Sequence, residues 1–260
     1  MSASLLNCQN GEHRLLGKLK ICDAHVHLGE SGPWQPYSTP TILVEELIKL
    51  FNQFSVERAL VFPNPNVGDK YPETNDYIAQ CVKKYPHRLV GFGRVDPRRG
   101  KEAIDEVIRF KDKLALTGLK LHPMVECFRP DHPFFDNFFE KVNELGVPLL
   151  IHTGDGFSSP GLVLKVAKKY PSLTIILGHL KEGCLSALKE SENIYVETSG
   201  TLPEFIEMSM DIDEDRVLFG SDVPYHRYPV QIATVDAANI SNKAKRKVYY
   251  ENFQRLFKHT

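Results

Sequence analysis

The sequence predicts an α/β protein folded as a closed (β/α)8 barrel, the TIM barrel. The chain has 260 residues. Short apolar runs alternate along it with segments of helical periodicity, and we count eight such runs. This alternation implies parallel strands joined by right-handed crossovers, and eight units in about 250 residues match a barrel. A doubly wound open sheet is the alternative, weakened because no Gly-x-Gly-x-x-Gly follows a strand. We expect a single domain over residues 1–260.

The strands are expected where apolar runs stop at Gly, Pro or polar residues. The first covers 19–27 and is followed by a Gly- and Pro-rich segment at 29–40, which we expect to be an irregular loop. The other seven strands are expected at 57–63, 88–95, 118–122, 148–152, 173–179, 194–198 and 216–221.

Helices are expected between these strands because apolar residues recur there at spacings of three and four. Leu43, Leu47, Leu50 and Phe54 would share one face of a helix at 42–54. Lys-Lys-Tyr-Pro occurs at 83–86 and again at 168–171, and each copy would end a helix just before a strand. The remaining helices are expected at 73–84, 101–111, 134–145, 161–169, 182–190 and 203–210, with one or two more between 230 and 257.

The composition restricts the classes of function. The formal net charge is −1 and the basic residues are scattered, so we expect no nucleic-acid surface. About 18 consecutive apolar residues would be needed to cross a membrane, and no such run occurs. The 5 cysteines are far apart, which argues against a disulfide framework or a cysteine zinc site. We therefore expect a cytoplasmic protein with a small-molecule substrate, and a homo-oligomer is possible.

The pair His25 and His27 is the strongest local signal. Residues i and i+2 of a strand face the same side, so the two imidazoles would converge while Val26 packs on the other side. Neutral imidazole is a common ligand of Zn²⁺ and related ions. The pair therefore indicates half of a metal site, although two polar residues ending a strand and facing water would give the same pattern.

Further polar residues occupy the expected carboxyl ends of the strands, where barrel active sites are built. Five of the 10 histidines fall at such ends. The residues at these ends are His25, His27, Arg94, Asp96, Lys120, His122, His152, His179, Glu197, Ser199 and Asp222. Their convergence on one rim favours a site over independent surface residues.

These segments resemble the amidohydrolase superfamily, within it the amidohydrolase-related group that includes aminocarboxymuconate-semialdehyde decarboxylase. The similarity runs from Asp23-Ala24-His25-Val26-His27 through Gly118-Leu119-Lys120-Leu121-His122-Pro123, Ile151-His152-Thr153-Gly154 and Gly178-His179 to Phe219-Gly220-Ser221-Asp222 and Asn252-Phe253-Gln254-Arg255-Leu256-Phe257. The resemblance implies a divalent metal held by His25, His27, His152 and Asp222. It places His179 beside the metal as a catalytic residue or a second ligand.

Three imidazoles and one carboxylate suit Zn²⁺ as the first candidate, with Mn²⁺ or Fe²⁺ as alternatives. A metal-bound water becomes hydroxide near neutral pH, Asp222 can take and return its proton, and His179 can polarise a substrate carbonyl. Tyr225, in the loop after Asp222, is a weaker candidate for contacting the substrate.

Lys120 and Arg94 each allow more than one role. Lys120 and His122 are expected to contact substrate. Alternatively, Lys120 would be carbamylated and bridge two metals, as in binuclear relatives, or would pair with Glu197 or Asp155. Arg94 can bind a substrate carboxylate through two hydrogen bonds or pair with Asp96.

Four functions follow from this pattern. The leading hypothesis is a metal-dependent hydrolase that acts on a small lactone, ester or amide, and a non-oxidative decarboxylase of the same family stands close behind. A TatD-like metal nuclease is disfavoured because the last strand is followed by Gly-Ser-Asp where such nucleases usually carry Glu-Thr-Asp. A non-enzymatic metal-binding barrel is disfavoured because every ligand type is present.

Overall fold

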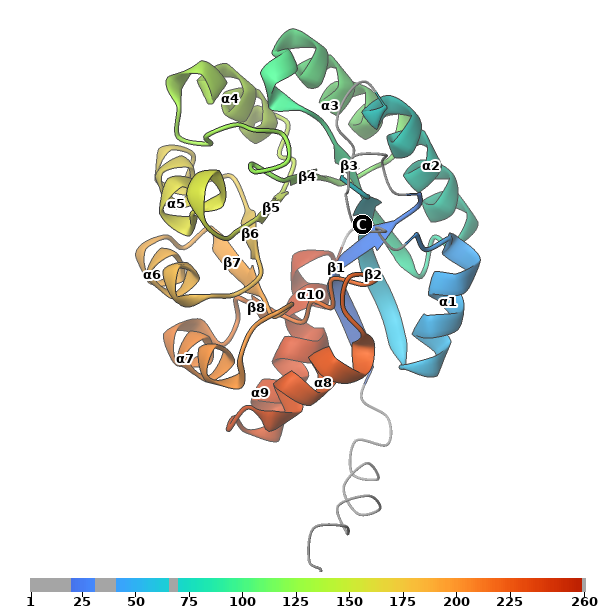
Figure 1. The fold of residues 1–260 in the computed structure, drawn as a ribbon, viewed down its shortest axis with the longest axis vertical. Coiled ribbons are helices and arrows are strands. Elements are labelled where there is room, and N and C mark those ends of the chain that lie inside the picture. Colours follow the sequence, from blue (N-terminus) through green and yellow to red (C-terminus); the bar gives the residue numbers. More distant parts are fainter. Residues whose placement is uncertain (1–19, 31–40, 66–69, 259–260) are drawn as a thin grey trace, which may run out of the picture.

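Eight parallel strands form one sheet in the order β1 to β8 (Figure 1). The computed structural model describes residues 20–30, 41–65 and 70–258. The strands are β1 (Ile21–Leu28), β2 (Val56–Pro63), β3 (Leu89–Arg94), β4 (Gly118–Leu121), β5 (Leu149–His152), β6 (Ile175–Gly178), β7 (Ile194–Glu197) and β8 (Val217–Leu218). The expected barrel class is confirmed, and residue 19 and most of the loop expected at 29–40 lie outside the described residues.

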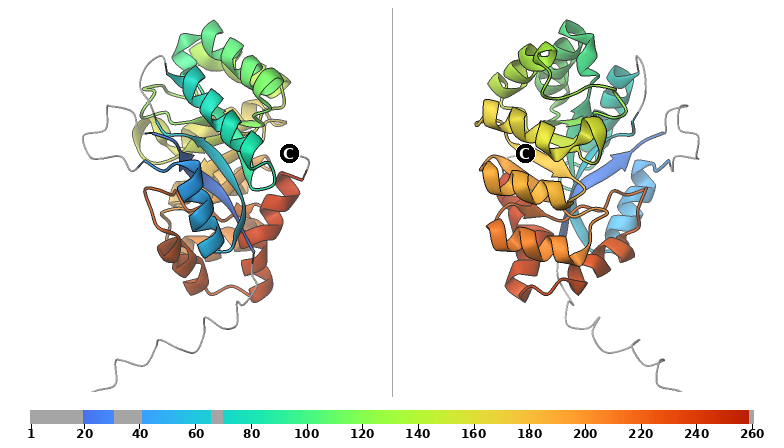
Figure 2. Two further views of the ribbon diagram at one scale, coloured as in Figure 1. Left: turned by 90° about the vertical axis from the view of Figure 1, so that its right-hand side faces the viewer. Right: turned by 60° about the vertical axis from the view of Figure 1, so that its left-hand side comes forward.

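Helices follow the strands and surround the sheet (Figures 1 and 2). They are α1 (Val44–Gln53), α2 (Tyr71–Lys84), α3 (Lys101–Leu114), α4 (Asp136–Glu144), α5 (Pro160–Lys169), α6 (Glu182–Glu190), α7 (Pro203–Asp213), α8 (Tyr228–Ala237), α9 (Asn242–Arg246) and α10 (Asn252–Leu256). Single turns lie at Pro97–Arg99, Pro133–Phe135, Gly156–Ser158 and Lys247–Glu251. The second helix begins at Tyr71, two residues earlier than expected, because Pro72 is well accommodated in a first helical turn.

The core has an outer layer, between strands and helices, and a smaller inner layer inside the barrel. Phe62, Phe92 and Leu150 belong to the inner layer, as do Phe253 and Phe257 from the C-terminal segment. These apolar side chains fill the barrel interior below the strand ends. Within the described ranges, no helix is long and apolar enough to cross a bilayer.

The barrel is joined between β8 and β1 by backbone hydrogen bonds. Ala24 N donates to Phe219 O and Asp222 N donates to His25 O, each at 2.8 Å. The strand expected at 216–221 contains only two ladder residues. After them, Phe219 N donates to Val248 O and Gly220 N donates to the Thr198 hydroxyl, so the backbone ladder with β7 does not continue. A register shift between Asp23 and Val26 also interrupts β1 here. Such irregularities reorient side chains, and this one separates apolar Ala24 from the histidines that follow.

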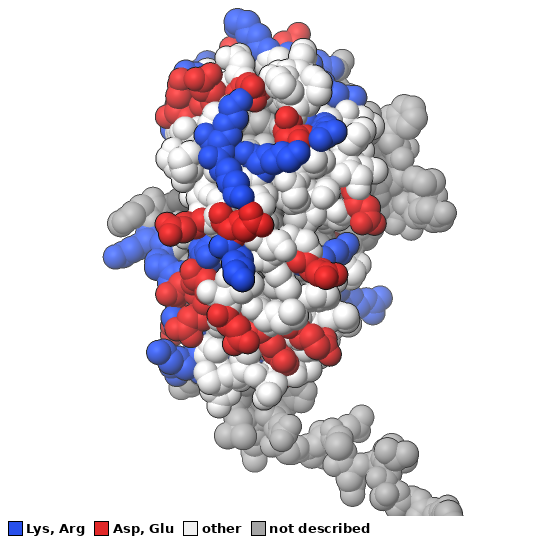
Figure 3. All heavy atoms as spheres, turned by 90° about the vertical axis from the view of Figure 1, so that its left-hand side faces the viewer, with Lys and Arg blue, Asp and Glu red and all other residues white. Residues whose placement is uncertain are grey.

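Acidic and basic side chains are intermixed on the surface that carries α5 and α6, the left-hand side of Figure 1 (Figure 3). Several form ion pairs, such as Lys168 with Glu190 and Lys169 with Asp136. This face therefore presents no continuous stripe of one charge.

Candidate metal centre

Two histidines and one aspartate meet at the junction of β1 and the segment after β8. The potential ligand atoms of His25, His27 and Asp222 all lie within 4.8 Å of one another. Nε2 of each histidine is 3.2 Å from Oδ1 of Asp222. All three residues are buried. The structure thus brings together three of the four residues expected to bind a metal.

Backbone strain is concentrated at this junction. Asp222 has φ of 57° and His179 has φ of 66°, in the left-handed region that residues with a side chain rarely adopt. Such conformations persist where the surroundings enforce them, and they cluster at active sites. The hydrogen bond from Asp222 N to His25 O is one such restraint, so the strained loop places the carboxylate opposite the two imidazoles.

Glu197, at the end of β7, fixes the orientation of His25. Its side chain is fully buried and accepts hydrogen bonds from His25 Nδ1 at 2.7 Å, His179 N at 2.6 Å, and both the backbone N and Oγ of Ser199 at 2.7 and 2.8 Å. Because Nδ1 of the neutral His25 ring carries the proton donated to Glu197, Nε2 is unprotonated and faces Asp222 with its lone pair. Burial raises the pKa of Glu197, and the hydrogen bonds from Ser199 and His179 oppose that rise.

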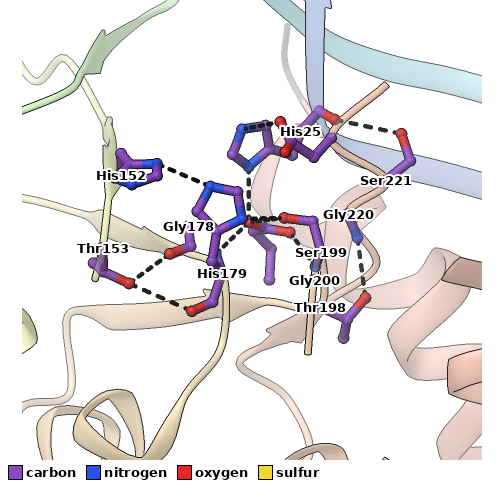
Figure 4. Close-up of polar contacts among 12 residues, drawn as sticks. His25, His152, Thr153, Gly178, His179, Thr198, Ser199, Gly200, Gly220 and Ser221 are labelled. Carbon is purple, nitrogen blue, oxygen red and sulfur yellow. Dashed lines mark hydrogen bonds and ion pairs between the residues drawn. The ribbon is translucent and has the colours of Figure 1, made fainter. Parts of the chain in front are cut away.

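A chain of hydrogen bonds extends from Glu197 to His152 (Figure 4). Ser199 Oγ donates to Glu197, so it accepts from His179 Nδ1 at 2.9 Å. His179 Nε2 is therefore unprotonated and accepts from His152 Nδ1, also at 2.9 Å. This sequence of donors leaves Nε2 of His152 without a proton, the form in which imidazole binds a metal.

Burial keeps these imidazoles neutral. It lowers the pKa of His25, His27 and His152 well below the ordinary value, and lowers the pKa of His179 to about 4. The donor set is thus neutral nitrogen plus one carboxylate, which fits Zn²⁺, Mn²⁺ and Fe²⁺. His25, His27 and Asp222 can hold such an ion. His152 is hydrogen-bonded to His179 and stays a predicted ligand.

Lys120 and His122 both lie beside the histidines. Lys120 is fully buried, with Nζ 3.2 Å from His25 Nε2 and 4.8 Å from the centre of the Phe62 ring. Burial lowers the pKa of its ammonium group, and the charge of Arg94 lowers it further. Among the described residues, Lys120 forms no ion pair with Glu197 or with Asp155. Glu197 bonds to His25 instead. His122 stacks on His152, with ring centroids 3.7 Å apart.

The pairing considered for Arg94 with Asp96 needs correction, whereas substrate binding by Arg94 stays a prediction. Arg94 is 0% exposed, and its Nε and a terminal guanidinium nitrogen each lie 2.9 Å from Glu126 Oε1. Asp96, considered as its partner, instead pairs with Arg98 at 2.7 Å. Glu126 was missed because it lies in the irregular segment after β4, where no periodicity predicts the chain path. Its other oxygen accepts from His122 N, so the pair of Arg94 and Glu126 supports the wall of the site. One terminal guanidinium nitrogen of Arg94 has no hydrogen-bond partner among the described residues.

Tyr225 lines the site on the side of His27. The two rings meet edge to face, with centroids 4.9 Å apart, and Tyr225 is half-buried. Its position beside a potential ligand agrees with the expected substrate contact, which stays a prediction.

Asp23 was missed although it begins the Asp-x-His-x-His run. It is fully buried and accepts hydrogen bonds from His25 N at 3.0 Å, Ser221 N at 2.9 Å and the Tyr228 hydroxyl at 2.8 Å. Burial raises the pKa of this carboxyl to about 6, and the bonds from Ser221 and His25 oppose the rise. Asp23 thus holds the residues that precede Asp222 against β1.

The sequence matches the amidohydrolase family model over residues 22–258. Among curated proteins, a gamma-resorcylate decarboxylase of Polaromonas sp. is 24% identical over 274 residues, covering 83% of each chain. One from Rhodococcus jostii is 20% identical over 81% of this chain and 86% of its own. A 2-amino-3-carboxymuconate-6-semialdehyde decarboxylase of Dictyostelium discoideum is 32% identical over 78 residues, covering 30% of this chain and 22% of its own.

Solved structures share the fold. A 2,6-dihydroxybenzoate decarboxylase from Rhizobium superposes with a TM-score of 0.79 at 18% identity, covering 92% of this chain and 99% of the other. A dihydroxybenzoic acid decarboxylase from Polaromonas sp., solved with manganese and the inhibitor 2-nitroresorcinol, has a TM-score of 0.75 at 19% identity, covering 92% and 97%. At these identities the likeness establishes the barrel.

Proposed function

Since the chain belongs to the amidohydrolase family, we propose that it is a metal-dependent enzyme that removes CO₂, without oxidation, from a small carboxylated aromatic compound. The carrying observation is the buried group of His25, His27 and Asp222, with His179 beside it. Such a group at the carboxyl ends of barrel strands is typical of catalytic metal sites.

The relatives favour decarboxylation over the hydrolysis that the sequence pattern suggested first. Relatives matched over about four fifths of the chain are gamma-resorcylate decarboxylases, and similar structures include decarboxylases of hydroxylated benzoates. Three similar decarboxylase structures contain manganese. We therefore propose Mn²⁺ ahead of Zn²⁺, because the nitrogen and oxygen donors of this site accept either ion.

The bound ion would supply positive charge that attracts the substrate carboxylate and neighbouring oxygens. The chain supplies the proton. Decarboxylation breaks the bond between the ring carbon and the carboxylate, its electron pair returns to the ring carbon, and a proton forms the new C–H bond as CO₂ leaves. Asp222 is the proposed proton donor, because its buried carboxyl group faces the two imidazoles of the proposed metal site.

The role proposed for His179 differs from the polarisation of a substrate carbonyl that the sequence suggested. Ser199 holds the proton of its Nδ1, so Nε2 presents a lone pair. In this form His179 accepts a hydrogen bond from a substrate hydroxyl in place of His152, and it cannot donate to a carbonyl from that nitrogen.

A paired substrate screen tests the proposal. Metal-loaded protein is incubated with hydroxylated and amino-substituted benzoates, while CO₂ and the decarboxylated ring are both quantified. A second panel contains lactones, esters and amides. We expect equal amounts of CO₂ and product from at least one acid, and none with His25→Ala. Turnover confined to the second panel would restore the hydrolase hypothesis and refute decarboxylation.

A further inference from the structure

One exposed cation lies beside the histidines without a partner. Lys181 follows His179 by two residues and precedes α6. Its ammonium group makes no ion pair or hydrogen bond with another described residue, whereas Lys165, Lys168 and Lys169 are each paired. Lys181 is therefore an exposed, unpaired cation close to the end of β6, where His179 lies.

Gly154 leaves open the space between this ammonium group and His152. A Cβ atom at position 154 would lie 3.8 Å from His152 Nε2 and 4.0 Å from Lys181 Nζ. Gly154 does not have positive φ, so its backbone conformation does not require glycine. The absent side chain therefore keeps clear a path from the imidazole to the cation.

Two arginines at and after the end of β3 do not serve the same purpose. Arg94 is buried against Glu126, and Arg98 is paired with Asp96. Exposed apolar side chains stand on the neighbouring loop ends: Met124 is 49% exposed and Phe157 45% exposed. Met124 Sδ would be 3.4 Å from a Cβ at position 156. A cation next to apolar surface suits a ring that carries an anionic group.

We infer that Lys181 binds an anionic substituent of the substrate, remote from the reacting carboxylate, and that Gly154 leaves room for it. This inference rests on the proposed function, because it takes the reacting end of the substrate to lie at the metal centre. Lys181 is then a residue that determines specificity between acids of otherwise equal shape.

Calorimetric titration of Mn²⁺-loaded protein with benzoate and with isophthalate tests this role. The second carboxylate of isophthalate should improve affinity about tenfold, the size expected of a charge-assisted contact at a partly exposed site. Lys181→Met should remove that advantage and leave benzoate affinity within about twofold, while Lys181→Arg keeps most of it. Lys189→Met, a matched exposed lysine in α6, should change neither acid.

Gly154→Ala should weaken isophthalate more than benzoate, because its methyl group would lie between His152 and Lys181. Gly161→Ala should weaken neither, because its methyl group would meet only Ser159. An isophthalate advantage that survives in Lys181→Met, or that is absent from the wild type, overturns the inference. Metal content is measured on every sample. A wild type that takes up no metal refutes the proposed function, whereas normal metal uptake with equal binding of both acids, or with binding of neither, refutes only the role of Lys181.

Discussion

The properties of individual histidines follow from the groups that hold their protons. Glu197 and Ser199 determine which nitrogen is protonated on His25 and His179, and through His179 on His152. The lone pairs of His25 and His152 Nε2 follow from those contacts. Metal binding should therefore depend both on the imidazoles and on the carboxylate behind them.

Removing an imidazole should remove the ion. The wild type is expected to carry about one equivalent of Mn²⁺ or Zn²⁺ per chain, and His25→Ala or His152→Ala should lose most of it, because each deletes a nitrogen donor. His87→Ala, in the exposed turn before β3, should keep it. Elemental analysis after growth with added metal measures this. Equal metal content in all three variants would show that the ligands are assigned to the wrong strand ends.

Removing the charge of Glu197 should lower the affinity for the metal without abolishing metal binding. In Glu197→Gln an amide oxygen can still accept from His25 Nδ1, but the negative charge that raises imidazole basicity is gone. We expect metal affinity to fall about 10- to 100-fold, measured by competition with a fluorescent chelator. An unchanged affinity would assign Glu197 a packing role alone.

Asp222→Asn should separate proton transfer from metal binding. The amide can still offer an oxygen to the ion, yet it is no acid or base near neutral pH, so turnover should fall by about 10² to 10⁴. Metal occupancy should fall less than in His25→Ala. Stopped assays with the acid identified by the substrate screen measure the rate. Full rescue by excess metal would mean that Asp222 is a ligand only.

At the scale of elements, the sequence predicted the strand positions well and the connections poorly. The fifth strand was expected at 148–152 and lies at Leu149–His152, because its apolar run is bounded by Pro148 and by the polar residues that follow. The partners of Arg94 and Lys120 were not predictable, since they depend on Glu126 in an irregular loop and on the β1 register. Asp23 looked like an ordinary strand residue because Ser221, which donates a hydrogen bond to its carboxylate, lies 198 residues away in the sequence.

A glycine in the segment after β8 makes room for Glu197. A Cβ at position 220 would lie 1.7 Å from Glu197 Oε2, and Gly220 does not have positive φ, so the requirement is steric. Gly220→Ala should lower the free energy of unfolding by about 1–3 kcal/mol, as expected of overpacking, and should weaken metal binding by displacing Glu197. Urea denaturation of the metal-free protein measures the first effect.

Gly161→Ala is the control for this substitution, because its new methyl group meets only Ser159 Oγ at 3.8 Å. It lies in α5, where alanine is favoured over glycine, so the free energy of unfolding should rise by up to about 1 kcal/mol. Equal free energies of unfolding for Gly220→Ala and the wild type would show that the side chain of Glu197 has space to move.

At the scale of the whole molecule, the metal centre coincides with the place where the barrel closes. His25 and His27 come from β1 and Asp222 from the segment after β8, and the same segments exchange the closing hydrogen bonds. A ligand held by both therefore stabilises the closure as well as the site.

Metal should accordingly raise the melting temperature. At a free concentration 100 times the dissociation constant, binding stabilises the folded state by about 2.7 kcal/mol, which corresponds to about 5–10 °C for a chain of this size. Scanning fluorimetry with and without Mn²⁺ measures the shift, with His25→Ala as the control expected to show almost none. If metal does not change the melting temperature of the wild type, metal binding does not stabilise the closure of the barrel.

The closure also bears on how the protein is made. Asp23 and Ser221 bond across 198 residues, and at ordinary translation rates these residues are synthesised roughly 10 to 40 s apart. Until β8 is made, the edge of β1 that faces β8 lacks its hydrogen-bond partners, and the carboxylate of Asp23 lacks Ser221. The group formed by His25, His27 and Asp222 is therefore complete only after the last strand has been translated.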